Sequence, residues 1–533
     1  MPFCLTGCGS LPLAHPGPPR SAWRSHAALA GAALSAVLAT AASCGGATSD
    51  IDSYPIAIGR APLGAPAMDA GFDADQSADS GPPVEAGALV ATAELADDPT
   101  GQSFPMVIDT ASPITILAGA SGTTPQTAPA GFDLLGADGT PGADASSAPV
   151  RARFRGWDVL QLPLQPIGDG SVLPQGVLGG DLLRSFSVEF RFGMLCPSGG
   201  SALCTSITFW SQLGADDGFL EDAGFAVIGF TLFGGGEVTA NGDPDFLGLR
   251  GPLTVPPTRV VLRGCAVPNF FSPAVAAATV QPACCTATDA ANQSTGVDLS
   301  LLVDTGVGPM VLSASAWARV AGAASSAALG LPPLPVATPV PAPPPLRIAT
   351  WPTPIDVLLW AELPRYALVN LEAGVNDDPG PCVELARARR TEIVSYDTVM
   401  NPSLHTCGAP CDLDPNNSGE AQNSAAYLEV GGRIPVAVIS DDEPFLQGLR
   451  FDVLPEGPEI DGLVGANALG RARMELDYPA SSPRAVFSCE GDAPRTECWA
   501  AARCPQLPDT SSIHYCFGLG PHTLAATCAP SGC

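Results

Sequence analysis

The stretch FPMVIDTASPITIL, residues 104–117, places an aspartate, Asp109, in the middle of an apolar run. The stretch SLLVDTGVGPMVLS, residues 300–313, does the same with Asp304, 195 positions later. Carboxylates are rarely buried in full unless a partner satisfies them or chemistry uses them. Two runs with the same internal order need a common explanation, and that explanation decides the fold.

A second repeated element follows each aspartate run. The segment GVLGGDLLRSFSVEFRF, residues 176–192, aligns without gaps on GLVGANALGRARMELDY, residues 462–478. Both begin with Gly, two apolar residues, Gly, a small residue, then Asp or Asn, and both end in an alternating pattern typical of a strand. The aspartate lies 70 residues before the second glycine in the first copy and 161 residues before it in the second copy. The sequence therefore predicts two related lobes, the second with a long insertion.

The composition favours turn-rich β structure. The chain has 533 residues, with 58 Gly, 56 Pro and only 14% charged residues, and this mixture is typical of β architecture rather than helical bundles. Lys and Arg number 24 against 53 Asp and Glu, a net charge of −29. Such a surface repels phosphate backbones, so no nucleic-acid partner is expected.

The N-terminus has the features of an export leader. Arg20 and Arg24 precede an Ala- and Leu-rich stretch, Ala27–Ser43, which is too short and too weakly apolar to span a membrane. The residues before Cys44 resemble the lipidation box of bacterial lipoproteins, although Ala41 occupies a position where Leu is usual. The alternative is an ordinary cleaved signal peptide with Cys44 incidental.

The cysteines agree with export. Of 17 cysteines, 14 follow Cys44, and an even number suits paired disulfides in an oxidising compartment. The Gly45–Gly46 pair resembles that of lipoproteins sent to the outer membrane of Gram-negative bacteria. We expect a cell-envelope lipoprotein held at the outer membrane or cell surface by a lipid on Cys44. The CGAPC segment, Cys407–Cys411, is expected to be a small disulfide loop, because its spacing is not that of a C-x-x-C redox centre.

The chain divides into five expected segments. These are a signal peptide (1–43), a lipid anchor with a flexible acidic linker (44–87), an N-terminal lobe (88–250), a C-terminal lobe with an insertion (251–488) and a disulfide-rich tail (489–533). The first strand is expected over ALVATAEL, residues 88–95, and a short helix from Ser313. The Pro-rich segment Leu331–Leu346 is expected to be a surface loop.

The motifs VIDTAS and LVDTG, each followed by an apolar-apolar-Gly element, resemble those of aspartic peptidases of the pepsin and retropepsin type. The resemblance implies an all-β, bilobal pepsin-like architecture of two pseudo-symmetric retropepsin-like β-barrel lobes with few short helices. It also implies a monomer whose two lobes pair within one chain, a peptide or protein substrate, and neither metal nor cofactor.

By this resemblance, Asp109 and Asp304 would form a catalytic dyad. Two carboxylates within hydrogen-bonding distance hold one proton between them, and aspartic proteases are the established example. The ionised partner can take a proton from a bound water while the protonated partner donates to the scissile carbonyl. Thr110 and Thr305 would cross-link the two loops, and Gly306 would complete the second loop. The hydroxyl of Ser112 would support a carboxylate oxygen.

Three positions depart from the family pattern. Ala111 replaces the usual Gly, so the turn needs a backbone conformation that tolerates a Cβ. Val307 occupies the position that matches Ser112 and has no hydroxyl. No tyrosine marks a pepsin-type flap, and the candidate flap hairpin is Arg151–Leu164, with Trp157 near its tip.

Two functions therefore stay open: an aspartic endopeptidase, and a catalytically inactive, surface-anchored binding protein on the same bilobal fold. Other enzyme classes have little support. The three histidines beyond the leader, His405, His514 and His522, lack a metal-binding spacing, and no G-x-S-x-G nucleophile turn is found.

Overall fold

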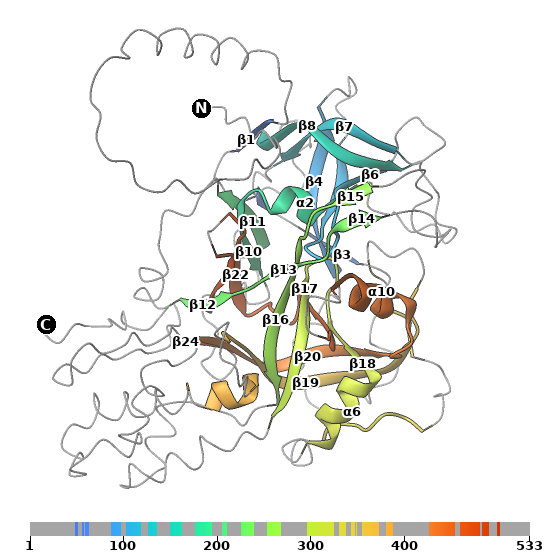
Figure 1. Ribbon diagram of the computed structural model, residues 1–533, viewed down its shortest axis with the longest axis vertical. Helices are drawn as coiled ribbons and strands as arrows, with labels where there is room; N and C mark the ends of the chain where they lie inside the picture. The colour runs from blue at the N-terminus through green and yellow to red at the C-terminus, as the bar shows by residue number, and fades with distance from the viewer. Residues whose placement is uncertain are drawn as a thin grey trace, which may run out of the picture.

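The computed structural model describes the chain in segments. They are residues 48–51, 56–57, 59–62, 87–96, 103–118, 126–135, 150–162, 176–193, 205–210, 225–238, 253–267, 296–323, 330–336, 343–346, 348, 354–371, 380–386, 388, 426–453, 459–479, 482–489 and 498–501. Strands dominate these residues and the helices are few and short. Figure 1 shows one lobe around β4, β7 and β8 and a second around β16–β20. The expected all-β, bilobal fold is confirmed.

The N-terminal lobe is built on an eight-stranded sheet. Its strands are β1 (Thr48–Ile51), β3 (Gly59–Pro62), β4 (Gly87–Leu95), β5 (Ser103–Ile108), β6 (Ile116–Ala118), β7 (Gln126–Leu135), β8 (Val150–Leu162) and β9 (Gly176–Leu178). The short helix α2 (Gly180–Leu183) follows β9 directly.

The C-terminal lobe is built on a second eight-stranded sheet. Its strands are β13 (Leu232–Phe233), β16 (Arg259–Ala266), β17 (Val297–Asp304), β18 (Met310–Ser313), β19 (Val357–Val369), β20 (Tyr427–Ile439), β21 (Gly462–Gly465) and β24 (Cys498–Ala501). Helices α6 (Ala314–Gly322) and α10 (Pro444–Val453) belong to this lobe, and a separate ribbon joins β14 (Gly236–Val238) to β15 (Leu253–Val255).

The two sheets share one topology. In the first lobe β9 runs parallel to β5 and antiparallel to β6, and β6 runs parallel to β8 of the β7–β8 hairpin. In the second lobe β21 runs parallel to β17 and antiparallel to β18, and β18 runs parallel to β20 of the antiparallel β19–β20 pair. The repeated sequence elements therefore occupy equivalent places, which confirms the prediction of two related lobes.

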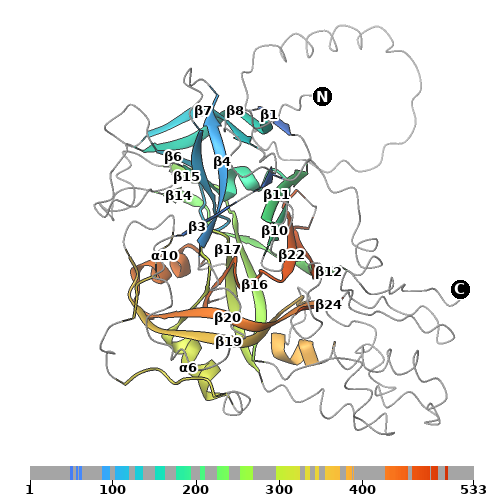
Figure 2. The same cartoon turned by 180° about the vertical axis from the view of Figure 1, so that it is seen from behind.

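A third sheet joins the lobes, as Figure 2 shows from behind. Its strands are β2 (Ile56–Ala57), β10 (Ser187–Phe192), β11 (Thr205–Trp210), β12 (Ala226–Gly229), β22 (Ala472–Asp477) and β23 (Arg484–Cys489). The central pair is antiparallel, with β10 from the first repeat against β22 from the second. Its register sets Glu189 opposite Glu475, and these two residues are also equivalent in the ungapped alignment.

Part of the predicted flexible linker is folded, so this prediction was wrong for residues 48–51, 56–57 and 59–62. Strands β1, β2 and β3 lie within residues 44–87 and pair with β8, β11 and β4. Backbone hydrogen bonds to strand edges make this possible, because pairing with an exposed edge needs little apolar sequence. Cys44 and the CGAPC segment lie outside the described residues, so the lipid anchor and that disulfide loop stay predictions.

Aromatic packing in the first lobe explains the position of the Trp157 side chain. Phe154 contacts Phe132, Phe186 and Phe209 at ring-centroid distances of 5.0–6.1 Å, and Trp157 lies edge-on to Phe154 at 6.5 Å. Trp157 is paired with Ala130 in the middle of the β7–β8 hairpin. Its placement near a flap tip was therefore wrong, because the two strands are joined between residues 135 and 150, and the ring packs on the core instead.

Short local features of the second lobe follow the sequence closely. The expected helix is α6, and its N-cap Ser313 accepts a hydrogen bond from the Ala316 N–H at 3.2 Å. The described parts of the Pro-rich segment form no helix or strand beyond one isolated bridge. Indole N–H groups donate to its carbonyls, Trp317 to Pro332 and Trp360 to Pro344. None of the helices in the described segments is long and apolar enough to cross a membrane.

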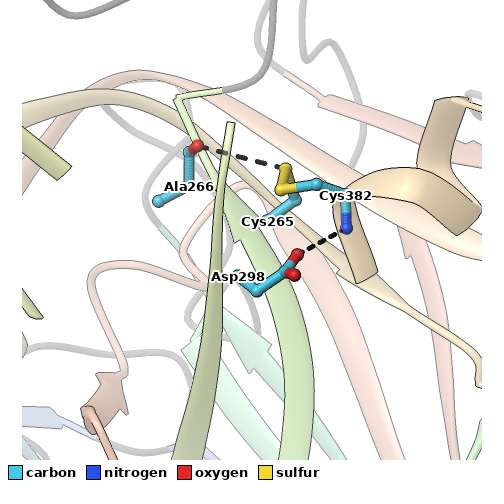
Figure 3. Close-up of a disulfide and its surroundings, with 4 residues drawn as sticks. All are labelled: Cys265, Ala266, Asp298 and Cys382. Atoms are coloured by element: carbon cyan, nitrogen blue, oxygen red, sulfur yellow. Dashed lines mark hydrogen bonds between the residues drawn. A yellow bond between two sulfur atoms is a disulfide. The ribbon is translucent and has the colours of Figure 1, made fainter. Parts of the chain in front are cut away.

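Two disulfides lie in the described segments. Cys265 of β16 is bonded to Cys382, 117 residues later, and the Cys382 N–H donates to Asp298 (Figure 3). Cys489 is bonded to Cys498, nine residues later, at the start of the predicted tail. The first disulfide fastens the segment between β19 and β20, where Cys382 lies, to β16 of the second lobe.

Candidate active site

The two repeated aspartates lie at the carboxyl ends of equivalent strands. Asp109 follows β5 directly, and its N–H donates to the Leu178 carbonyl of β9 at 3.1 Å. Asp304 is the last residue of β17, and its register partner on β21 is Gly465. Each aspartate is thus held beside the apolar-apolar-Gly strand of its own lobe.

The repeated glycines are explained by crowding. A Cβ on Gly179 would lie 2.2 Å from the Ile114 carbonyl oxygen, and a Cβ on Gly465 would lie 2.2 Å from the Pro309 carbonyl oxygen. These distances are far below van der Waals contact, so any larger residue would displace the backbone that follows the aspartate. The glycines allow this backbone to pass close to β9 and β21.

The next residue of each glycine element holds the aspartate loop of its lobe. The Gly180 N–H donates to the Ser112 carbonyl at 2.7 Å, and the Ala466 N–H donates to the Val307 carbonyl at 2.9 Å. Equivalent atoms therefore make the same bond in both lobes. The repeated motifs fix the two loops in matching positions relative to their own sheets.

The two loops are cross-linked by their threonines. The Thr110 hydroxyl donates to the Val303 carbonyl at 2.9 Å, and the Thr305 hydroxyl donates to the Ile108 carbonyl at 2.8 Å. Each hydroxyl also accepts the backbone N–H of the opposite threonine at 3.2 Å. All four bonds cross between lobes and both threonines are fully buried, so the predicted cross-link is found.

The carboxylates of Asp109 and Asp304 face each other across these loops. Asp109 Oδ1 accepts the N–H groups of Ala111 and Ser112 at 2.8 and 3.0 Å, and Asp304 Oδ1 accepts the Gly306 N–H at 2.8 Å. A Cβ on Gly306 would lie 2.7 Å from Asp109 Oδ2. The second loop therefore packs directly on the carboxylate of the first, and the exposed fractions are 0% for Asp109 and 1% for Asp304.

The environment of Asp304 favours its protonated form. Burial raises the pKa of Asp304 well above its usual range, and the neighbouring Asp109 raises the pKa further. The Gly306 N–H and the positive charge of Arg259 act in the opposite direction. Because the two acids interact directly, they can hold one proton jointly.

The three departures from the family pattern have different outcomes. Ala111 does not have a positive φ, so its Cβ causes no backbone strain. Val307 is fully buried in an apolar cluster with Ala111. The role expected for the Ser112 hydroxyl was wrong, because this group donates to the Ile114 carbonyl at 2.9 Å and it is the Ser112 backbone N–H that binds Asp109.

Arg259, which the sequence analysis did not single out, contacts the first loop from the second lobe. Its Nε donates to the Ala111 carbonyl at 3.3 Å, and the residue is 6% exposed. The sheet registers make Arg259 the equivalent of the buried Ala88 in the first lobe. A comparison of β4 with β16 could have found Arg259, since a charged side chain stands on β16 where β4 has a small apolar one.

Within the described segments, no group of three or more His, Cys, Asp or Glu side chains could hold a metal ion. Another acid beside the first loop is Asp181, whose Oδ1 accepts the Thr115 hydroxyl at 2.7 Å and the Leu182 N–H at 2.8 Å. Burial raises the pKa of Asp181. Both hydrogen bonds of Asp181 are made within the first lobe. Asp181 therefore orients α2 against the loop and does not join the Asp109–Asp304 pair.

Comparison with known proteins gives little at the level of sequence. No known family matches the chain, and no curated protein matches it. Among solved structures, an aspartic proteinase from Irpex lacteus is similar at 12% identity and a TM-score of 0.28, over 77% of this chain and 96% of that one.

Proposed function

We propose that the chain is an aspartic-type endopeptidase that hydrolyses peptide bonds with Asp109, Asp304 and an activated water. The observation that carries the proposal is the direct interaction of two buried acids from equivalent loops, which are cross-linked by Thr110 and Thr305. Two buried acids in contact are costly for stability, and this cost is understandable if the pair performs proton transfer.

The surroundings of the two acids support a division of roles. Asp304 carries the shared proton, because burial and the neighbouring charge raise its pKa. Asp109 accepts two backbone N–H groups against one for Asp304, and such bonds favour an ionised carboxylate. Asp109 would then take a proton from the attacking water while Asp304 donates its proton to the carbonyl oxygen of the substrate. The collapse of the tetrahedral intermediate returns a proton to the leaving amine and regenerates the pair.

The test is cleavage of an unfolded protein by the full chain between pH 3 and 7, with new termini identified by mass spectrometry. Asp109→Asn and Asp304→Asn should each lower the rate on the order of a thousandfold, the range of general acid–base catalysis. Asp441→Asn is the matched control, because this acid bonds Ser315 in the first turn of α6 and lies outside the pair. Retained activity in either dyad variant would refute the assignment.

A binding protein with an inactive site is the second candidate. The observation that favours it is the nearly complete burial of both carboxylates, 0% and 1% exposed, since a substrate and a water must reach them. A wild-type chain that cleaves no unfolded protein at any pH in the series, while it binds peptides, would establish this candidate and exclude the peptidase.

A further inference from the structure

The first strand of the second lobe reaches across to the site of the first lobe. Arg259 begins β16, is 6% exposed, and donates from Nε to the Ala111 carbonyl at 3.3 Å. In return, the N–H of Leu89 on β4 donates to the Thr305 carbonyl at 3.2 Å. Each lobe thus fixes the other's loop, and of these two contacts the one from the second lobe uses a charged side chain.

The residue before Arg259 shows how tightly this strand is set. A Cβ on Gly180 would lie 2.5 Å from the Thr258 Cβ, so Thr258 packs directly against the glycine element of the first lobe. The Thr258 N–H donates to the Phe233 carbonyl at 3.1 Å, which holds the strand start. The guanidinium is therefore carried on a fixed backbone and not on a free loop.

We propose that Arg259 is a positioning residue of the Asp109–Asp304 pair: it fixes the carbonyl of Ala111 and places a buried positive charge against the loop that carries Asp109. This inference rests on the proposed peptidase function, which it deepens. A buried arginine remains charged at every relevant pH, so its field acts throughout the working range. The charge opposes the combined effect of burial and of the two acids on each other.

The groups that act on the pair can be named. Asp304 is influenced by the charges of Asp109 and Arg259 and by the Gly306 N–H. Asp181, another acid packed against the first loop, is bonded to Thr115 and lies near the charge of Arg184. Among the charged groups that act on Asp304, Arg259 is the cation that lowers its pKa.

The experiment compares the full wild-type chain with Arg259→Gln, Arg259→Lys and the control Arg263→Gln. Arg263 is also on β16, with Ser300 as its register partner. The first measurement is the pH profile of kcat/KM on a fluorogenic peptide. The second is titration of the carboxyl carbon of Asp304 by NMR with ¹³C-labelled aspartate, with the resonance assigned from Asp304→Asn.

In Arg259→Gln both limbs of the profile and the Asp304 titration should move up by about one pH unit, the effect of losing one nearby opposite charge. Arg259→Lys should keep the limbs near wild type but lower kcat roughly tenfold, because a lysine cannot reproduce the guanidinium geometry that positions the loop. Arg263→Gln should match wild type in both measurements.

A Gln variant with unmoved limbs and an unmoved Asp304 titration would overturn the proposal. If that variant does not fold, a Lys variant with wild-type kcat overturns it instead. If the wild-type chain cleaves nothing, the peptidase function fails, and the NMR titration still decides whether Arg259 controls ionisation of the pair. The two failures are therefore distinguishable.

Discussion

Replacing Glu475 by Gln is expected to stabilise the chain at pH 8 and to leave its stability unchanged at pH 4. Glu475 is 6% exposed and faces Glu189 at the centre of the sheet that joins the lobes. Glu189 is bound by Arg191 and Arg473. Glu475 Oε1, in contrast, has no hydrogen-bond partner within the described part of the chain.

The magnitude follows from the pKa of Glu475, which is raised from 4.5 to about 7. Burial is the largest cause, the charges of Glu189 and Asp477 add to it, and the charge of Arg473 opposes it. One pH unit corresponds to about 1.36 kcal/mol, so the ionised form of Glu475 costs the folded state about 3 kcal/mol. The folded chain keeps a proton that the unfolded chain has lost, so wild-type stability falls as the pH rises from 4.5 to about 7.

The assay is chemical denaturation of the wild type and Glu475→Gln at pH 4 and pH 8. Glutamine resembles the neutral carboxyl, so the variant should gain up to about 3 kcal/mol at pH 8 and nothing at pH 4. Glu189→Gln is the matched control with the opposite sign at pH 8, because it removes the acid that both arginines bind. A Glu475 variant with the same gain at both pH values, or with none at pH 8, would refute the ionisation argument.

Two further changes test the loops and the insertion. Gly306→Ala should lower peptidase activity roughly a hundredfold, because the added Cβ would lie 2.7 Å from Asp109 Oδ2 and displace that carboxylate. Ala111→Gly should retain most of the activity. Equal activity of the two variants, measured on the same peptide, would contradict this. Replacing both Cys265 and Cys382 by Ala should cost up to about 5 kcal/mol of stability in denaturant unfolding, because this disulfide closes a long loop and restrains the unfolded chain strongly. Loss of the Cys489–Cys498 disulfide, which closes a loop of nine residues, should cost about 3 kcal/mol. A smaller loss from the longer loop would contradict the entropic reasoning.

Much of the site was predictable because its determinants are local and repeated. The aspartate runs and the glycine elements are short motifs, and the spacing between them is free to vary. The glycines are required by backbone crowding at Ile114 and Pro309. That constraint acts in both lobes and leaves the same trace in both copies of the sequence.

The contacts between lobes were not predictable in this way. Ser187 and Asp477 are hydrogen-bonded although they lie 290 positions apart, and a strand's alternating pattern does not identify its partner. The ungapped alignment already matched Glu189 with Glu475. Only the antiparallel register shows that they meet. The short strands β1–β3 were missed for a related reason, since backbone pairing at a sheet edge depends little on side chains.

The two acid pairs have one origin in the symmetry of the fold. A residue near the approximate two-fold axis of a duplicated chain lies close to its own equivalent, so an acid there meets an acid. This holds for Asp109 with Asp304 and for Glu189 with Glu475.

Departures from symmetry then decide how each pair carries its charge. In the joining sheet both arginines bind Glu189, and in the alignment their equivalents are Asp477 and Ser187. At the candidate active site Arg259 occupies the position in the second lobe that corresponds to Ala88 in the first lobe. A symmetric pair would share its proton equally, whereas at Asp304 burial and the charge of Asp109 outweigh the opposing charge of Arg259 and favour the protonated form.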